Sequence, residues 1–252
     1  MKMQLSKKLI KNIIGLSFIS SLAISAPSIA NTLTDAELQK AIEAKLTVQL
    51  ESADVAAYTA EFLMNEILTW KGEELPLNEA DSILAYAFGN RVMSNGNQIP
   101  GPMNEALADT VVEIYKQTGK PVYAQWEIAQ SIGERIPAEH LFSIDPKIAP
   151  DGTLTYLSTN GVAEEAVKQS GGDLGKTVVV GFYEHSLRTI NTSKSFGIDA
   201  YAPEGIQLPH DYDEQSGQGW TRDAKTFVMH EVRNRGTNER DRLIKIATSE
   251  EK

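Results

Sequence analysis

Residues 177–188 read Thr-Val-Val-Val-Gly-Phe-Tyr-Glu-His-Ser-Leu-Arg, and this stretch decides the fold. Its first half is an apolar run rich in valine, which is typical of a parallel strand buried on both faces. We expect a helix from Ser186 to Ser195 and a further strand at residues 197–202, ending at Pro203. A strand, a helix and a strand in this order predict a βαβ unit, whose two strands pair in parallel.

The same alternation of strands and helices extends towards the N-terminus. Residues 82–88 form a short apolar run that stops at Gly89, as a buried strand does. The other expected elements are a strand at 120–126, helices at 103–118, 127–135, 158–170 and 220–235, and an element at 141–144 whose type the pattern leaves open. Together they predict an α/β fold, with a mostly parallel sheet covered by helices on both faces.

Two helices are expected to precede the sheet. Thr34-Asp35-Ala36-Glu37 has the form of a capping box, in which side chains satisfy the free N–H groups of a first helical turn. Asp54 to Trp70 is a second amphipathic stretch. We therefore divide the chain into a helical lead-in at residues 31–76, an α/β domain at 77–235 and a charged tail at 236–252, which we expect to be frayed.

The first 30 residues have the layout of a secretory signal. Four lysines precede an uncharged apolar run at residues 13–24, and Ser28-Ile29-Ala30 offers small residues at the two positions that a signal peptidase reads. The run is shorter than the roughly 20 residues that span a bilayer, so we expect cleavage after Ala30 and no membrane insertion afterwards. An uncleaved anchor is the alternative. The expected location is the periplasm, with full secretion as the other possibility.

Charge and cysteine content limit the partners and the chemistry. The chain carries a formal net charge of −10, and removal of the signal, with its four lysines and no acid, makes it −14. Because no lysine- or arginine-rich block remains, we expect neither nucleic acid nor an anionic membrane surface as a partner. The chain has no cysteine, which excludes disulfides, thiol nucleophiles and cysteine-type zinc sites.

In a parallel α/β sheet, ligands bind beyond the carboxyl ends of the strands. That rule points to residues 89–91, Glu127 and the segment Glu184 to Arg188. His185 and Arg188 are three residues apart at the start of a helix, where exposed N–H groups favour an anion. The guanidinium of Arg188 matches phosphate or carboxylate, and His185 can exchange protons near neutral pH. The alternative is a structural cluster, in which the arginine pairs with the acid four residues before it.

Two more charged residues are candidates for the same site. Glu105 lies in the first turn of the helix at 103–118. In one interpretation it transfers a proton in the site, and in the other it only complements the helix dipole. Arg91 follows the turn at Gly89-Asn90, either to close on the anion or as a solvated loop residue.

Four short motifs occur in the order and spacing of a known family. They are Ala87 to Arg91, Asn104-Glu105-Ala106, Ser158-Thr159-Asn160, and Val178 to Arg188 followed by Gly197. From Asp81 to about Arg233 the chain resembles the bacterial domain-of-unknown-function 218 family, the YdcF-, SanA- and ElyC-like proteins. The resemblance implies a Rossmann-like three-layer sandwich, an envelope location, and a link to envelope integrity or cell-wall precursor metabolism.

These observations give one set of candidate residues. The candidate catalytic residues are His185 and Glu105, and the candidate ligand-binding residues are Gly89, Asn90, Arg91, Thr159, Glu184 and Arg188.

Other motifs do not indicate metal or cofactor chemistry. His210 to Glu214 is rich in carboxylates but lacks the spacing of a calcium loop, so we expect a solvated acidic loop. His230-Glu231 lacks the second histidine of the zinc-protease motif. We therefore predict no metal site and name no cofactor.

Two functional hypotheses follow from the sequence. In the first, a periplasmic α/β protein binds a small anionic, phosphate-bearing molecule and in addition processes it. In the second, the protein is a non-catalytic envelope scaffold whose helical lead-in docks a protein partner. Departures from the family pattern favour the second, since the first turn has one glycine where the family has two or three, and Glu184 precedes His185 where the family has a small polar residue.

Overall fold

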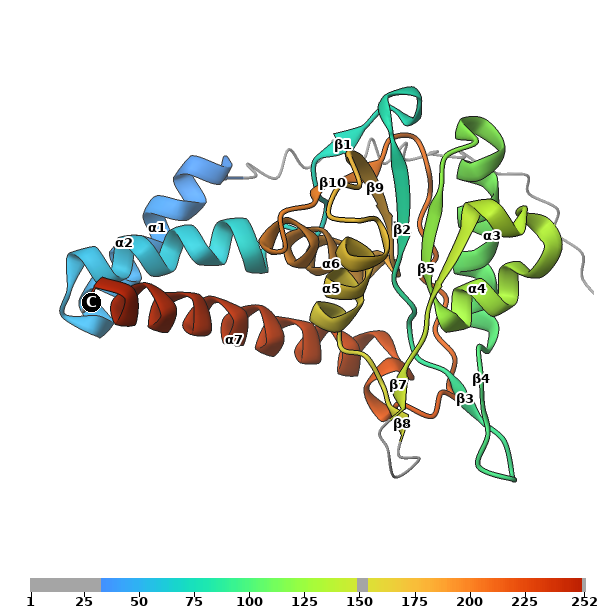
Figure 1. Ribbon diagram of the computed structural model, residues 1–252. Coiled ribbons are helices and arrows are strands. Elements are labelled where there is room, and N and C mark those ends of the chain that lie inside the picture. The colour runs from blue at the N-terminus through green and yellow to red at the C-terminus, as the bar shows by residue number, and fades with distance from the viewer. Residues whose placement is uncertain (1–32, 149–153, 251–252) are drawn as a thin grey trace, which may run out of the picture.

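The computed structural model describes residues 33–148 and 154–250 of the chain (Figure 1). The expected signal segment lies outside the described residues. None of the described helices is both long enough and apolar enough to cross a membrane.

A six-stranded sheet, in the order β1-β10-β9-β2-β5-β6, forms the centre of the molecule. All neighbouring strands in it run parallel. The strands are β1 (Glu74–Leu75), β2 (Ser82–Ala85), β5 (Val122–Gln125), β6 (Leu141–Ile144), β9 (Lys176–Val180) and β10 (Asp199–Pro203). The valine-rich run predicted to be a buried strand is β9, which lies next to β2 near the middle of the sheet.

Helices cover both faces of the sheet, which confirms the predicted Rossmann-like three-layer α/β fold (Figure 1). The main helices after β1 are α3 (Pro102–Thr118), α4 (Trp126–Ile132), α5 (Thr159–Gln169), α6 (Tyr183–Ser195) and α7 (Ala224–Glu250). The remaining short pieces are η2 (Leu77–Glu79), η3 (Gly133–Arg135), η4 (Ala138–His140) and η5 (Gly219–Thr221), and the hairpins β3 (Arg91–Val92) with β4 (Gln98–Ile99) and β7 (Lys147–Ile148) with β8 (Leu154–Thr155).

Alternation of side chains along β2 divides the core in two. Ile83 and Ala85 pack into a cluster with residues of α3 and α4, and this cluster also includes Phe227 of α7. Leu84 points to the other face and packs with residues of α5 and α6. Because both faces of the strand are buried, β2 reads as a continuous apolar run rather than as alternating polar and apolar residues.

An arm of helices stands beside the α/β body (Figure 1). It consists of α1 (Asp35–Leu50) and α2 (Ala53–Phe62), and α2 continues into a π-helical turn, η1 (Leu63–Ile67). The predicted capping box is present, since the Thr34 side chain accepts from the N–H of Glu37 and the Glu37 side chain accepts from the N–H of Thr34.

Several predicted bounds were wrong. The final helix does not end at Arg235 in a frayed tail, but continues as α7 to Glu250. A single internal glycine, Gly236, costs a helix only about 1 kcal/mol. Beyond it, Glu239 and Arg242 hydrogen-bond the Tyr58 hydroxyl of α2, which holds the extended helix in place. The segment between the strand predicted at 82–88 and the helix predicted at 103–118 contains the β3–β4 hairpin, and the element left open at 141–144 is strand β6.

We expect the Phe182→Ala variant to lose about 3–5 kcal/mol of unfolding free energy. Phe182 is fully buried at the end of β9, stacks on Phe88 with ring centroids 3.9 Å apart, and meets Tyr212 edge-on. Urea unfolding followed by circular dichroism measures the loss. The Phe196→Ala variant is the control, because that ring is 37% exposed, and its loss should stay near or below 1 kcal/mol. Equal losses in both variants would contradict this assignment of the core.

Candidate functional site

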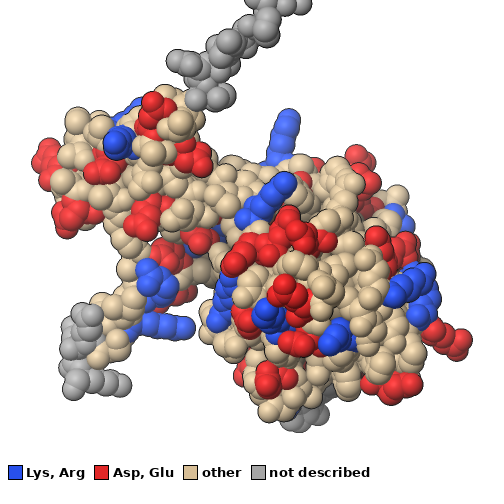
Figure 2. All heavy atoms as spheres, turned by 90° about the horizontal axis from the view of Figure 1, so that it is seen from above, with Lys and Arg blue, Asp and Glu red and all other residues tan. Residues whose placement is uncertain are grey.

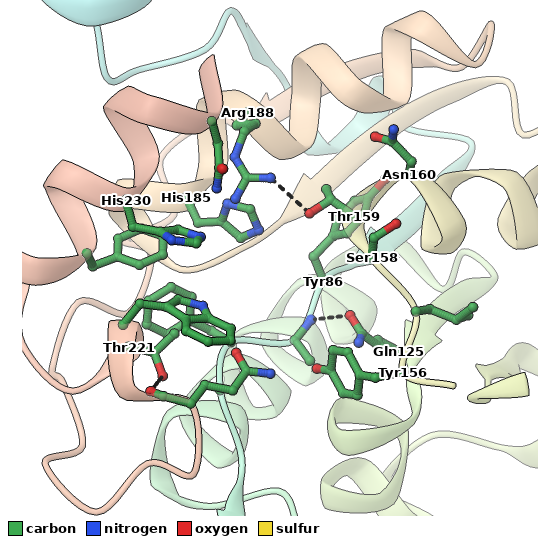
Figure 3. Close-up of a pocket in the computed structure, with 18 of the residues that line it drawn as sticks. Tyr86, Gln125, Tyr156, Ser158, Thr159, Asn160, His185, Arg188, Thr221 and His230 are labelled. Atoms are coloured by element: carbon green, nitrogen blue, oxygen red, sulfur yellow. Dashed lines mark hydrogen bonds between the residues drawn. The ribbon is translucent and has the colours of Figure 1, made fainter. Parts of the chain in front are cut away.

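A cavity of about 360 Å³ opens where the carboxyl ends of β2, β5 and β9 meet the start of α5 and α7 (Figure 3). This is the position that the topology of a parallel sheet predicts for a ligand. We call it the candidate pocket. Its lining residues are Tyr86, Ala87, Phe88, Gly89, Gln125, Tyr156, Leu157, Ser158, Thr159, Asn160, His185, Arg188, Gln218, Trp220, Thr221, Phe227, His230, Asn234 and Asn238.

The floor of the candidate pocket is the turn after β2. Gly89 has a φ of +65°, and a Cβ at this position would lie 2.6 Å from Oγ of Ser216 and 2.7 Å from Oγ1 of Thr221. Glycine is therefore required both by the backbone conformation and by the space. The buried amide of Asn104 holds the turn, because its oxygen accepts from the N–H of Phe88 (2.8 Å) and its nitrogen donates to the carbonyl of Gly89 (2.8 Å).

One wall is a buried ion cluster formed by α6 and α7. Arg188 donates from Nε to both carboxylate oxygens of Glu231, at 2.9 Å each, and Arg235 donates to the same carboxylate at 3.3 Å. Glu231 is fully buried, and its carboxylate also lies 3.6 Å from Nδ1 of His185. Two arginines around one carboxylate leave the cluster with a net positive charge, which faces the candidate pocket through Arg188.

The environment of His185 sets its protonation state. Burial, together with the charge of Arg188, lowers the pKa of His185 to about 4, although Glu231 acts in the opposite direction. Although burial raises the pKa of Glu231, the contact with His185 and the charges of Arg188 and Arg235 hold that pKa below its ordinary value. At neutral pH, His185 is therefore a neutral imidazole beside a carboxylate, and its lowered pKa makes it a weaker base than an ordinary histidine.

The N-terminus of α5 forms the opposite wall. Ser158 caps this helix, since its hydroxyl accepts from the N–H of Gly161. Thr159 follows, and its hydroxyl accepts from Nη1 of Arg188 at 3.0 Å. The first turn of the 11-residue helix thus lies beside the guanidinium, and both favour negative charge.

A third wall contains a buried carboxyl behind a tyrosine. The hydroxyl of Tyr156 donates to Oε1 of Glu127 at 2.6 Å, and Oε2 of Glu127 has no hydrogen-bond partner among the described residues. Burial raises the pKa of Glu127 to about 7. Beside it, Gln125 accepts from the N–H of Ala87 (3.1 Å), which ties the ends of β5 and β2 together.

Four of the predicted site residues meet in the candidate pocket, namely Gly89, Thr159, His185 and Arg188. The expectation that His185 and Arg188 share a face agrees with this arrangement. The alternative partner for Arg188 was wrong, because the arginine pairs with Glu231 of α7 and not with Glu184.

The other four predicted residues do not line the candidate pocket. Arg91 is held by a bidentate ion pair with Asp213, at 2.8 and 3.0 Å. Glu105 is exposed on the first turn of α3, where its charge acts on Arg91. Asn90 is buried, and its carbonyl accepts from the N–H of Gly217.

Glu184 precedes His185 at the start of α6 but does not line the candidate pocket. It is half-buried against Tyr212, and burial raises its pKa. The prediction that the acidic loop at His210 to Glu214 is solvated was wrong for Asp213, which is only 7% exposed and pairs with Arg91. Within the described residues, no group of three or more metal-ligating side chains comes together.

Sequence reasoning missed the contribution of α7. Phe227, His230, Asn234 and Asn238 line the candidate pocket from successive turns of this helix, at spacings of three or four residues, and Glu231 pairs with Arg188 beside them. The helical spacing of these residues in the sequence shows that they share one face of the helix. It does not show that this helix folds back over the edge of the sheet.

Comparison with known proteins does not supply an identity for this site. No family model matches the chain, and no curated protein matches it.

The chemistry of the candidate pocket is polar and free of acid. Of the described residues that line it, Arg188 carries a formal charge at neutral pH, and none is a carboxylate. Amide and hydroxyl side chains line the candidate pocket together with Arg188. Trp220 stacks on His230, with ring centroids 5.4 Å apart. Such a pocket can bind an anion beside Arg188 and hold an uncharged polar group against the amides and the aromatic rings.

We expect the Glu127→Gln variant to be more stable than the wild type at pH 8, by roughly 1–3 kcal/mol, and equally stable near pH 4.5. The folded-state pKa of about 7 lies above the ordinary value of 4.5, so the wild-type fold loses stability as the pH rises through this window. Glutamine keeps the acceptor for Tyr156 and cannot ionise. Urea unfolding at pH 4.5, 6, 7 and 8 measures the difference.

The matched control is Glu134→Gln, the same change at an exposed carboxyl, which should leave the pH profile of stability unchanged. If Glu127→Gln gave a difference that did not vary with pH, the carboxyl would not titrate in this window.

Proposed function

We propose that this chain is a periplasmic α/β protein that binds a small anionic, phosphate-bearing molecule in the candidate pocket. Arg188 and the first turn of α5 hold the anion, and the amides and aromatic rings hold the uncharged part of the ligand. His185 is placed to accept a proton from the bound molecule if the protein also processes it. Glu105 has no part in this proposal, because it does not line the candidate pocket.

One observation carries the proposal: a half-buried arginine and the N-terminus of a helix meet at the carboxyl edge of the sheet, in a cavity whose described lining has no carboxylate. The chain as a whole is acidic, with 34 acidic and 24 basic residues, so an acid-free cavity is not a consequence of composition. Over the face drawn in Figure 2, acidic and basic side chains are interspersed and form no continuous basic surface, which favours a small ligand over a polyanion.

The resemblance to the domain-of-unknown-function 218 family is part of the same proposal. The family motifs that contain Gly89, Thr159, His185 and Arg188 supply residues to one cavity, although they are far apart in the sequence. A shared site is a reason for such motifs to occur together. The periplasmic location rests on the signal-like residues at the N-terminus, and the link to envelope or cell-wall precursor metabolism rests on the resemblance.

We expect the Asn160→Asp variant to bind the ligand at least tenfold more weakly than the wild type, with an unchanged or slightly higher melting temperature. Asn160 is exposed on the first turn of α5 and lines the candidate pocket. A new carboxylate there complements the helix dipole but repels a bound anion. A thermal-shift screen of nucleotides, sugar phosphates and lipid-linked precursors first identifies a ligand, and calorimetric titration then compares the variants.

The control is Asn95→Asp, the same change in the exposed turn between β3 and β4. It should leave affinity unchanged. Asn160 serves this test better than Arg188, since removal of Arg188 leaves the buried Glu231 with one arginine fewer and destabilises the fold. If no compound bound, or if both aspartate variants bound equally well, the proposed site would be wrong.

A second candidate function, the envelope scaffold, is favoured by an apolar groove on the helical arm. Tyr58 and Phe62 of α2 line it with Leu243 and Ile244 of α7. We expect an Ile244→Ser variant to lose a protein partner recovered by cross-linking from a periplasmic extract. Ile246→Ser is the matched control, because Ile246 is exposed on the same helix and does not line the groove. Recovery of the partner by Ile244→Ser would count against the scaffold.

A further inference from the structure

The candidate pocket continues into a second cavity between α6 and α7, which we call the α6–α7 cleft. Asn160, Arg188 and Asn238 line both. The cleft has a volume of about 540 Å³ and extends along α7 towards the helical arm. Its other lining residues are Phe62, Glu66, Asn191, Thr192, Lys194, Ser195, Arg235, Glu239, Asp241, Arg242 and Lys245.

The lining of the cleft has more basic than acidic side chains, although Glu231, which does not line it, bonds two of its arginines. Five basic side chains and three acidic ones line it, namely Arg188, Lys194, Arg235, Arg242 and Lys245 against Glu66, Glu239 and Asp241. The whole chain, in contrast, has a net charge of −10. The uncharged lining consists of Phe62 and five amide or hydroxyl side chains, which can hydrogen-bond a polar, negatively charged group.

Arg235 gives the cleft a donor that is already in place. Its side chain is 2% exposed, and Nη1 donates to the carbonyls of Glu66 (2.6 Å) and Thr69 (2.9 Å). Nη2 is buried and has no hydrogen-bond partner among the described residues. A buried guanidinium N–H without an acceptor is costly, and an anion in the cleft would supply one.

Arg235 and Arg188 are also close to each other. Both donate from Nε to the same oxygen of Glu231, at 3.3 and 2.9 Å. In a diphosphate, one bridging oxygen links two phosphate groups, so each group can bind one of the two arginines at the same time. A single phosphate has fewer acceptor oxygens to share between them.

We infer that the binding site extends from the candidate pocket into the α6–α7 cleft and that its ligand carries a diphosphate. One phosphate lies beside Arg188 and the first turn of α5, and the second lies in the cleft beside Arg235, with Arg242 and Lys245 at the outer rim. This inference rests on the proposed function, because it adds a second anion subsite to the same pocket.

The test compares ligands that differ by one phosphate. Calorimetric titrations of the full mature chain, in EDTA and at fixed ionic strength, measure inorganic phosphate against pyrophosphate and UMP against UDP. The diphosphate of at least one pair should bind ten times more tightly, or more, than its monophosphate. A preference for UDP over UMP alone would show that a nucleoside contributes to binding. A preference for pyrophosphate over phosphate would show that the diphosphate is sufficient.

The rim provides variants that should not disturb folding. The double change Arg242→Gln and Lys245→Gln should remove most of the preference for the diphosphate and leave the affinity for the monophosphate within about twofold. The matched control is Arg240→Gln with Lys225→Gln, which removes the same charge from the same helix outside both cavities and should keep the preference.

The outcomes separate the two proposals. Equal binding of monophosphate and diphosphate would overturn the second subsite and leave the proposed function standing. If both double variants lost the preference for the diphosphate, the total positive charge of α7, and not the cleft, would select it. That outcome would overturn the inference. Absence of binding by every phosphate compound would overturn the proposed function and the inference with it.

Discussion

The buried carboxylate of Glu231 is the constraint on which the site depends. It is fully buried in α7, and a charge in that position is tolerated only because Arg188 of α6 and Arg235 of α7 surround it. This arrangement fixes how α7 lies against α6. It also aligns the guanidinium of Arg188 with Thr159, which orients the start of α5. Burial and the charge of Arg188 keep His185 neutral against the effect of Glu231. The elements around the candidate pocket are therefore positioned by one acid that never touches the cavity.

The sheet supplies the platform for this cluster. Valine and alanine in β9 and β2 are buried on both faces, and this burial is the main source of stability in a chain that has no disulfide. Where the two strands end, Tyr86 to Phe88 and Phe182 leave the ladder and Gly89 makes a turn that no larger residue fits. The parallel sheet thus brings three separate loops to one edge, and the ion cluster closes that edge from the side of α7.

The sequence was sufficient to predict the sheet and its helices, because buried strands and amphipathic helices leave periodic apolar patterns in the sequence. The rule that ligands bind beyond the carboxyl ends of parallel strands pointed to Gly89, His185 and Arg188, and the family resemblance pointed to Thr159. These four residues line the candidate pocket. It did not predict that Arg91 would be occupied by Asp213, which is 122 residues away, nor that Glu231 would take the place of Glu184 beside Arg188. Long-range ion pairs of this kind depend on how helices fold back over the sheet, and no local pattern records that.

The continuity of α7 has a mechanical consequence. The helix has its first turns in the hydrophobic core at Phe227 and its last turns against α2, and its 27 residues span about 40 Å. A rigid rod of this length transmits a tilt at one end to the other, so a load on the helical arm is carried to the residues around Glu231. The weakest point of the rod is Gly236, one residue beyond Arg235. Stiffness at that residue sets how far the arm and the sheet edge can move independently.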